Sequence, residues 1–186
     1  QNAFDNIIHE HLEFYTLASI RYLFEQVGLK ILDAQLNNVN AGSVRVIATK
    51  NRNRLRDVAL FDKEIGEYRI QSYLWKEKNN DVENPETYIR FMRRVQEQKE
   101  RLMTLLYKLN SEGKTVFGYG ASSKGNTLLQ FYGINTDLVK AIVERQPKKH
   151  GLLTAGTWIP IISEEEMRAA RPDYLLILPW HFIHEF

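Results

Sequence analysis

The 186-residue chain contains no cysteine, which excludes disulfide bridges, thiol nucleophiles and Cys-ligated zinc within these residues. An excess of charge of one sign is also lacking. Lys and Arg number 25 against 23 Asp and Glu, a net charge of +2, and the two signs are interleaved along the chain. No basic patch of the kind that attracts nucleic acids or membranes stands out, so the sequence predicts neither as a partner.

Long hydrophobic runs are missing as well. The chain has no secretory segment and no stretch that could span a bilayer, and we therefore expect a cytoplasmic protein. With 44% hydrophobic residues it can bury a core, either as one larger domain or as two small ones. Residue 1 is Gln, so we expect the chain to be part of a longer reading frame.

The first third of the chain predicts a helix followed by two strands. Residues 16–27 place apolar side chains at helical spacing, and Gly28 is positioned to end the helix. Two strand-like segments follow, 29–36 and 43–50, with a turn-rich link that is too short for a crossover. They are therefore expected to pair in antiparallel fashion. Residues 51–84 are polar and weakly periodic, which favours a linker.

The remaining residues, 85–186, predict an α/β domain. Asn84 resembles an N-cap with Pro85 at the first helical position, and a long amphipathic helix runs from there to Gly113. Beyond it, strand-like and helix-like segments alternate: a strand at 114–120, a helix from Ser123, a strand at 138–144, a helix capped by Ser163 and a strand at 173–179. This alternation predicts a small parallel sheet with helices on its faces, the Rossmann-like arrangement.

A glycine-interrupted turn, "VFGYGASSKGNT", joins the first strand of that domain to its helix. Gly118 and Gly120 permit a tight turn and close backbone approach, and the helix N-terminus offers N–H donors and a positive dipole to an anion. Ser122, Ser123 and Lys124 add donors and a charge. Both an anion site and a purely structural turn remain open.

The turn does not match the established phosphate-binding patterns. The dinucleotide fingerprint G-x-G-x-x-G requires a glycine where this chain has Ser123, and the spacing of a P-loop is not found. Glu144 lies at the end of the following strand, where a Rossmann domain often carries an acid that binds a ribose hydroxyl. A solvated strand end is the alternative for this residue.

A second candidate site is the sequence "HEH", in which His9, Glu10 and His11 precede the first helix. Two imidazoles could ligate a metal, but neither a third ligand nor the H-E-x-x-H spacing is present, so no metal site is predicted. We favour His11 as a general base, because imidazole titrates near neutral pH, with Glu10 as its orienting partner. A surface or capping histidine is the alternative.

Taken together and in order, several segments closely resemble the C-terminal part of the S-adenosylmethionine-dependent sugar C-methyltransferases that act on nucleotide-linked ketosugars. These segments are "FDNIIHEHLEFYTLASIRYLFEQVGLKILDAQ", "GSVRVIATK", "GYGASSKGNTLL", "VERQPKKHG", "GTWIPI" and "PDYLLILPWHFIHE". The resemblance implies that residues 1–50 are the end of a methyltransferase domain and that residues 85–186 form a Rossmann-like domain, which helps hold the nucleotide-sugar. Residues 51–84 would be the linker between the two domains. The S-adenosylmethionine loop and a cysteine zinc module would lie upstream, so no cofactor is expected in this piece and no activity from it alone.

In that family, removal of a proton next to a ketone gives an enolate that takes the methyl group. The resemblance implies His11 as the base with Glu10 beside it, and a substrate-binding set of Gly118, Gly120, Ser122, Ser123, Lys124, Asn126 and Glu144. One position departs: the family commonly has a tyrosine three residues before the base, where this chain has Ile8.

Two other functions compete with this one. An NAD-dependent nucleotide-sugar epimerase or dehydratase would need the true glycine fingerprint and a Tyr-x-x-x-Lys pair, and neither is convincingly placed. A non-catalytic nucleotide-sugar-binding module is favoured by Ile8. Apolar surface on the first fifty residues could also drive homodimerisation.

Overall fold

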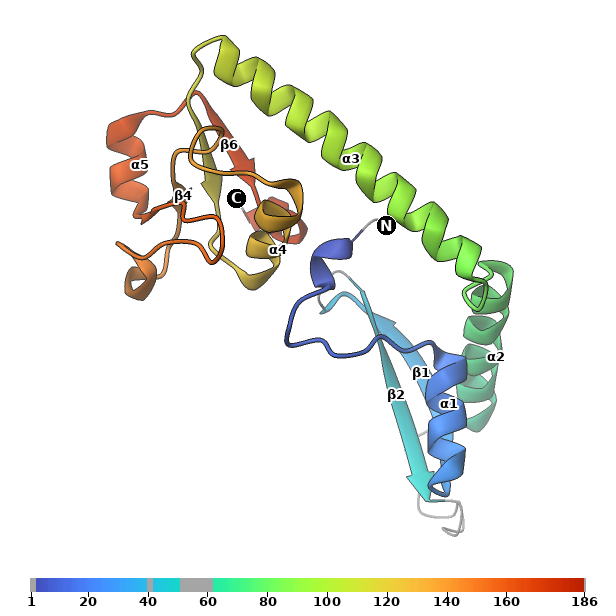
Figure 1. The fold of residues 1–186 in the computed structure, drawn as a ribbon. Helices are drawn as coiled ribbons and strands as arrows, with labels where there is room; N and C mark the ends of the chain where they lie inside the picture. The colour runs from blue at the N-terminus through green and yellow to red at the C-terminus, as the bar shows by residue number, and fades with distance from the viewer. Residues whose placement is uncertain (1–2, 40–41, 51–61, 186) are drawn as a thin grey trace. The chain divides into compact units, whose positions relative to one another are not determined.

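The computed structural model describes residues 3–39, 42–50 and 62–185, and it divides into two compact units (Figure 1). One unit consists of residues up to 12 together with residues 91–186, and the other of residues 13–90. The sequence grouped residues 1–12 with the strands that follow them, whereas the structure packs them with the C-terminal domain. Among the described residues, no helix is long and apolar enough to cross a membrane.

The unit of residues 13–90 contains helix α1 (Leu17–Gln26), strands β1 (Leu29–Asn37) and β2 (Ser43–Lys50), and helix α2 (Lys63–Asn79). β1 and β2 pair in antiparallel fashion, with a bulge between Ile31 and Asp33, which confirms the predicted strand pair. Thr16 caps α1 by accepting a hydrogen bond from the Ser19 backbone N–H.

Helix α2 corrects the expectation of a linker at 51–84. Residues 51–61 of that span lie outside the described part of the chain, but 63–79 are helical. Few apolar side chains of α2 pack on the cluster formed by α1 and β1, namely those of Ile70, Tyr73 and Leu74. So few apolar positions in a polar helix give a weak periodic signal, which is why the sequence pattern missed it.

Two close contacts hold α2 in this unit. The Glu77 carboxylate accepts hydrogen bonds from the backbone N–H groups of Leu17 and Ala18, at 2.5 and 3.1 Å, and so caps the N-terminus of α1. At the other end of α2, a Cβ atom at Gly66 would overlap the carbonyl oxygen of Leu32 in β1. The helix backbone therefore lies directly against the strand backbone, a distance that only glycine permits.

The second unit is built around a four-stranded parallel sheet. Its strands are β3 (Val116–Tyr119), β4 (Ile142–Val143), β5 (Ile161–Ile162) and β6 (Tyr174–Ile177), in the order β5-β4-β3-β6. Every neighbouring pair is parallel, which confirms the Rossmann-like prediction. β5 begins at the last residue of "GTWIPI", where the sequence pattern predicted no strand.

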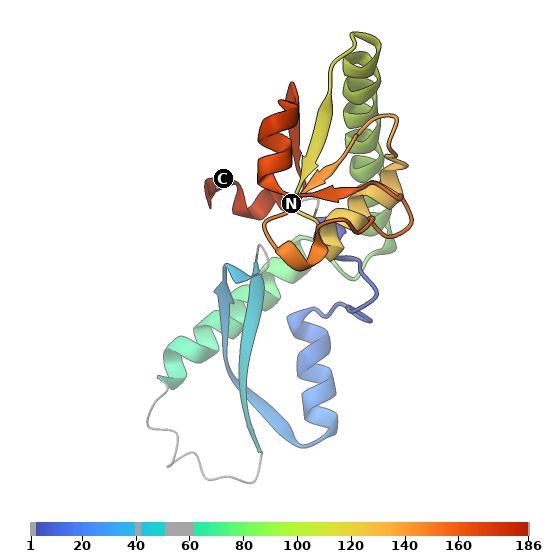
Figure 2. The same cartoon turned by 90° about the vertical axis from the view of Figure 1, so that its left-hand side faces the viewer.

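Helices cover both faces of this sheet (Figure 2). Helices α3 (Pro85–Ser111) and α4 (Ser123–Tyr132) pack on one face, and α5 (Glu164–Ala170) packs on the other. Alternate residues of β3 face opposite layers, with Val116 in the α3 and α4 core and Phe117 in the α5 core. Short 3₁₀ turns complete the unit, namely η1 (Phe4–Asn6), η4 (Pro147–Lys149) and η5 (Trp180–Glu185).

The predicted helix ends are largely confirmed. Asn84 accepts a hydrogen bond from the Glu86 backbone N–H at 3.0 Å, which supports its role at the start of α3. Ser163 and Glu166 form a reciprocal capping box on α5. These caps depend on residues within one turn of each other, so the sequence alone was enough to place them.

We predict that Gly66→Ala destabilises the unit of residues 13–90. The added methyl group must separate α2 from the Leu32 carbonyl, and overpacking of this kind costs about 1–3 kcal/mol. Thermal denaturation, together with hydrogen exchange of the β1 amides, would measure the effect. Tyr68→Ala on the exposed face of α2 is the control, and equal stability of the two variants would contradict the close approach.

Candidate functional site

His11 is oriented by a backbone carbonyl. Its Nδ1 lies 2.8 Å from the carbonyl oxygen of Asn6. A carbonyl oxygen only accepts hydrogen bonds, so Nδ1 must donate and carries the proton. In the neutral ring Nε2 then holds the lone pair, which is the form that a general base requires. The His11 backbone N–H also donates to the Ile8 carbonyl at 3.0 Å, which closes the turn that carries the ring.

Glu10 faces a different partner from the one expected. Its carboxylate lies 3.9 Å from Nε2 of His9, and both side chains are mostly exposed. The carbonyl of Asn6 makes a contact that orients the His11 ring. The sequence could not reveal this acceptor, because every residue has a carbonyl oxygen. In the described part of the chain, no group of three or more His, Asp or Glu residues could hold a metal ion.

The glycines of the turn after β3 are explained by packing. Gly120 has φ +94°, and a Cβ atom there would lie 2.6 Å from the Pro179 ring. A Cβ at Gly125 would lie 3.1 Å from the Gly120 carbonyl oxygen, and one at Gly118 would overlap the Ile142 side chain. Ser122 caps α4 by accepting from the Gly125 backbone N–H at 3.0 Å. The fold therefore requires Gly120 whether or not a phosphate binds, and close packing favours glycine at positions 118 and 125 as well.

Glu144 holds the turn from the end of β4. One carboxylate oxygen accepts the backbone N–H of Ala121 at 3.0 Å, and the other accepts that of Gln146 at 3.1 Å. Lys149 pairs with the same carboxylate at 3.4 Å and donates to the Ala121 carbonyl at 2.7 Å. Burial acts to raise the pKa of Glu144, but these hydrogen bonds and the Lys149 charge outweigh it and hold the pKa below its usual value.

The contacts of Glu144 with Ala121, Gln146 and Lys149 affect what the turn can bind. In a phosphate-binding turn the backbone N–H groups point at the anion. Here the Ala121 N–H already donates to a carboxylate, whose negative charge disfavours a phosphate at the same point. Glu144 serves in this arrangement to hold the loop, and the side chains that project from α4 are the remaining candidates for contact with a ligand.

A pocket of about 520 Å³ lies between the histidine segment and α4, within the unit that contains the Rossmann-like sheet. It is lined by Ile7, Ile8, His9, Ser123, Asn126, Thr127, Gln130, Phe131 and Ala155. The pocket thus brings part of the predicted turn next to the predicted histidine motif. The described residues that line it do not include Glu10, His11, Gly118, Gly120, Ser122, Lys124 or Glu144.

The polar wall of this pocket is one face of α4. Ser123, Asn126, Thr127 and Gln130 recur at spacings of three and four residues, which places them on the same side of a helix. Thr127 and Gln130 were missed as candidates, and this spacing is the signal that would have found them. The Asn126 side-chain oxygen is buried and has no hydrogen-bond partner among the described residues, so a ligand donor would satisfy it.

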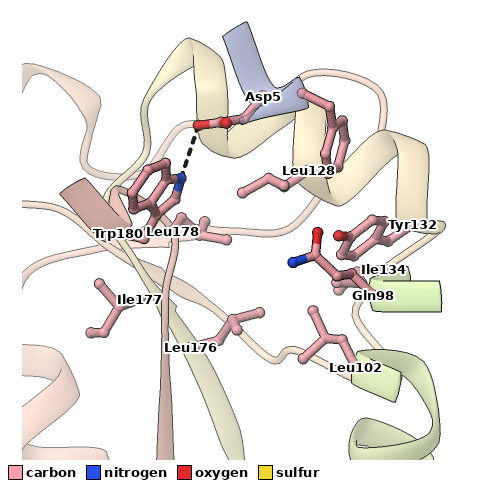
Figure 3. Close-up of a pocket in the computed structure, with 11 residues that line it drawn as sticks. Asp5, Gln98, Leu102, Leu128, Tyr132, Ile134, Leu176, Ile177, Leu178 and Trp180 are labelled. Carbon is pink, nitrogen blue, oxygen red and sulfur yellow. Dashed lines mark hydrogen bonds between the residues drawn. The ribbon is translucent and has the colours of Figure 1, made fainter. Parts of the chain in front are cut away.

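A second pocket of about 400 Å³ lies between η1, α3, α4 and β6, in the same unit (Figure 3). Its walls are mainly apolar, but they include the amide of Gln98 and the carboxylate of Asp5, a residue that is only 2% exposed. Asp5 accepts a hydrogen bond from Nε1 of Trp180 at 3.2 Å, shown by the dashed line in Figure 3. No sequence motif indicated this contact, because the two residues lie near opposite ends of the chain.

Comparison with known proteins adds two findings. Residues 38–186 match a family described as the C-methyltransferase C-terminal domain. The chain is also 32% identical, over 184 residues, to the C-methyltransferase NovU of Streptomyces niveus. That alignment covers 99% of this chain and 42% of NovU, so the chain spans less than half the length of this relative.

We predict that Glu144→Gln lowers the melting temperature at pH 7 by about 2–4 °C, the shift that about 1 kcal/mol produces in a chain of this size. The folded pKa of Glu144 lies below its ordinary 4.5, so the carboxylate stabilises the fold above that pH and loses this effect as the pH falls through the folded pKa. The difference between wild type and variant should therefore shrink as the pH is lowered below 4.5. Exposed Glu97→Gln is the control. If the difference in melting temperature between wild type and Glu144→Gln did not depend on pH, the carboxylate of Glu144 would not be what holds the turn.

Proposed function

The chain belongs to the C-methyltransferase C-terminal domain family, and we propose that it is the C-terminal part of an S-adenosylmethionine-dependent enzyme that methylates a carbon of a nucleotide-linked ketosugar. The observation that carries this proposal is the orientation of His11, whose Nδ1 donates to the Asn6 carbonyl and whose Nε2 is left with the lone pair. This arrangement supports a role in proton removal.

The reaction requires a base next to the carbon that is methylated. A proton on a carbon beside a ketone is acidic enough for Nε2 of His11 to remove, and the sugar is left as an enolate. The proton then resides on Nε2, and the resulting imidazolium donates a stronger, charge-assisted hydrogen bond to the Asn6 carbonyl. S-adenosylmethionine would supply the electrophilic methyl group.

No residue of this chain is assigned to that methyl donor. The glycine turn does not suit it, because the Ala121 N–H donates to Glu144 and the glycines are occupied in packing against β4 and the residues after β6. Its binding is therefore proposed for a part of the protein outside residues 1–186, as is the zinc module that the family resemblance implies.

The pocket beside the histidine segment is proposed to receive the nucleotide-sugar. Ser123, Asn126, Thr127 and Gln130 offer it both donors and acceptors, and a hydroxyl or base N–H of the ligand would satisfy the Asn126 oxygen. Lys124 remains a proposed phosphate contact at the start of α4. Gly118, Gly120 and Ser122 shape the turn that presents this helix, and Glu144 holds that turn in place.

A non-catalytic nucleotide-sugar-binding module is the second candidate. One observation favours it: Ile8 lines the pocket and presents an apolar side chain where the family resemblance leads us to expect a tyrosine hydroxyl. Such a module would bind the sugar and leave its acidic proton in place. Proton exchange at the carbon next to the ketone therefore separates the two functions.

We predict that His11→Gln in the full-length protein lowers methyl transfer by about 10²–10⁴-fold, the usual contribution of a general base, and leaves nucleotide-sugar binding intact. The measurement is loss of the proton next to the ketone in deuterated water, followed by NMR for a panel of dTDP-, UDP- and GDP-linked ketosugars. His150→Gln is the matched control, since glutamine can still donate to the Glu144 carbonyl that this ring contacts at 2.8 Å. Exchange at the wild-type rate in His11→Gln would rule out the base.

We predict that Asn126→Leu weakens binding of the preferred nucleotide by at least about tenfold while leaving the melting temperature unchanged or raised. The reason is that the variant removes a buried acceptor that gains nothing in the free protein. Calorimetric titration with dTDP, UDP and GDP measures the first effect and thermal denaturation the second. The same substitution at exposed Asn110 of α3 should leave binding unchanged, and Lys124→Ala tests the phosphate contact separately.

A further inference from the structure

We propose that Asp5 is a positioning residue for His11, acting through η1 and the carbonyl of Asn6. In this view the hydrogen bond between Asp5 and Trp180 fixes the acceptor that selects the His11 tautomer. The catalytic meaning of this device rests on the proposed function, but the orientation of the ring can be measured without any substrate.

The first step of the argument is the burial of a carboxylate in an apolar pocket. Asp5 is 2% exposed, and its surroundings include Leu128, Leu178 and the Trp180 ring (Figure 3). Burial of an ionisable group is costly unless a hydrogen bond compensates for it, and a well-packed apolar side chain of similar volume would often be more stable. A residue of this kind is better explained by the direction of its hydrogen bond than by stability.

The second step is that two contacts hold η1 from different sides. Trp180 begins η5, separated by two residues from the carboxyl end of β6, and its Nε1 donates to Asp5 at 3.2 Å. On the other side, the Phe4 ring packs on α4, with centroids 5.2 Å from Phe131 and 5.5 Å from Tyr132. The 3₁₀ turn is therefore fastened both to the end of the sheet and to the helix that walls the proposed sugar pocket.

The third step connects this anchor to the base. Asn6 is the last residue of η1, and its carbonyl oxygen accepts from the backbone N–H of Ile8 at 3.0 Å and from Nδ1 of His11 at 2.8 Å. His11 in turn donates its backbone N–H to Ile8. A rotation of η1 would move the Asn6 carbonyl away from the ring, because Asn6 directly follows Asp5 in the same turn.

The Asp5 carboxylate also affects a residue of α4. Burial, and to a smaller extent the Asp5 carboxylate, raise the pKa of the Tyr132 phenol above its usual value. Tyr132 and Asp5 line the same cavity in Figure 3. The carboxylate therefore acts on neighbours from both η5 and α4.

The test is the tautomer of His11, read from long-range ¹H–¹⁵N correlation spectra of the histidine rings in the ¹⁵N-labelled full chain at about pH 8.5. In the wild type we expect the Nδ1–H form. Asp5→Leu and Trp180→Phe should shift His11 toward the Nε2–H form, which free histidine favours in water, because the anchor is lost. Asp5→Asn should retain the wild-type signature, since its side-chain oxygen can still accept from Trp180.

His150 provides an internal control in the same spectra. Its Nε2 contacts the Glu144 carbonyl at 2.8 Å, so it should show the opposite tautomer in every folded variant. If Asp5→Leu fails to fold and the His150 signature is lost, Trp180→Phe decides, because it keeps an aromatic ring in place. An unchanged Nδ1–H form of His11 in every folded variant that lacks the Asp5–Trp180 bond would overturn the proposal.

A kinetic measurement on the full-length protein extends the test. Loss of the anchor should lower kcat by about tenfold and change KM by less than about threefold, with recovery in Asp5→Asn. If the tautomer shifts while His11→Gln leaves proton exchange unaffected, the positioning role stands and the proposed function fails. If the tautomer is unchanged while His11→Gln abolishes exchange, the reverse holds.

Discussion

Close packing between the turn after β3 and the residues after β6 determines where the rest of the site lies. Gly120 and Gly125 allow the turn to approach Leu178 and Pro179 at distances that a side chain would prevent. This approach fixes the start of α4, whose polar face walls the pocket beside the histidine segment. It also brings the chain that follows β6 to the point where Trp180 meets Asp5. Both segments of the site therefore depend on one backbone contact.

Because of the same packing, the glycines, the backbone N–H groups and the side chains of the turn have different roles. In phosphate-binding turns the glycines and the helix N-terminus serve one ligand together. Here the glycines serve packing, the Ala121 N–H binds Glu144, and Ser122 caps the helix. Polar side chains one and two turns further along α4 are what remain for a ligand. A sugar or a base, with its mixture of donors and acceptors, suits such a surface better than a bare phosphate does.

The features that could be predicted from the sequence are those encoded within a few residues. Pro85 after Asn84, the Ser163 and Glu166 pair and the glycine that follows β3 each specify a local geometry, and the strands between them follow from short apolar runs. The Rossmann-like order of the sheet followed from the alternation of these elements. By contrast, α2 was missed because few of its side chains are apolar, and its cap on α1 joins Glu77 to Leu17 across sixty residues. The association of η1 with the C-terminal domain likewise depends on tertiary packing, of which local patterns carry no trace.

The contact between His11 and Asn6 determines which positions of this segment tolerate amino-acid substitution. Its acceptor is a main-chain atom, so every amino acid at position 6 supplies it equally well. A scan of all single substitutions would therefore record residue 6 as permissive, although one of its atoms contacts the His11 ring. Sensitivity would appear instead at Phe4 and Asp5, whose ring contacts and hydrogen bond decide where that carbonyl points. In this segment, the positions that sequence variation can reveal are not those that make the contact.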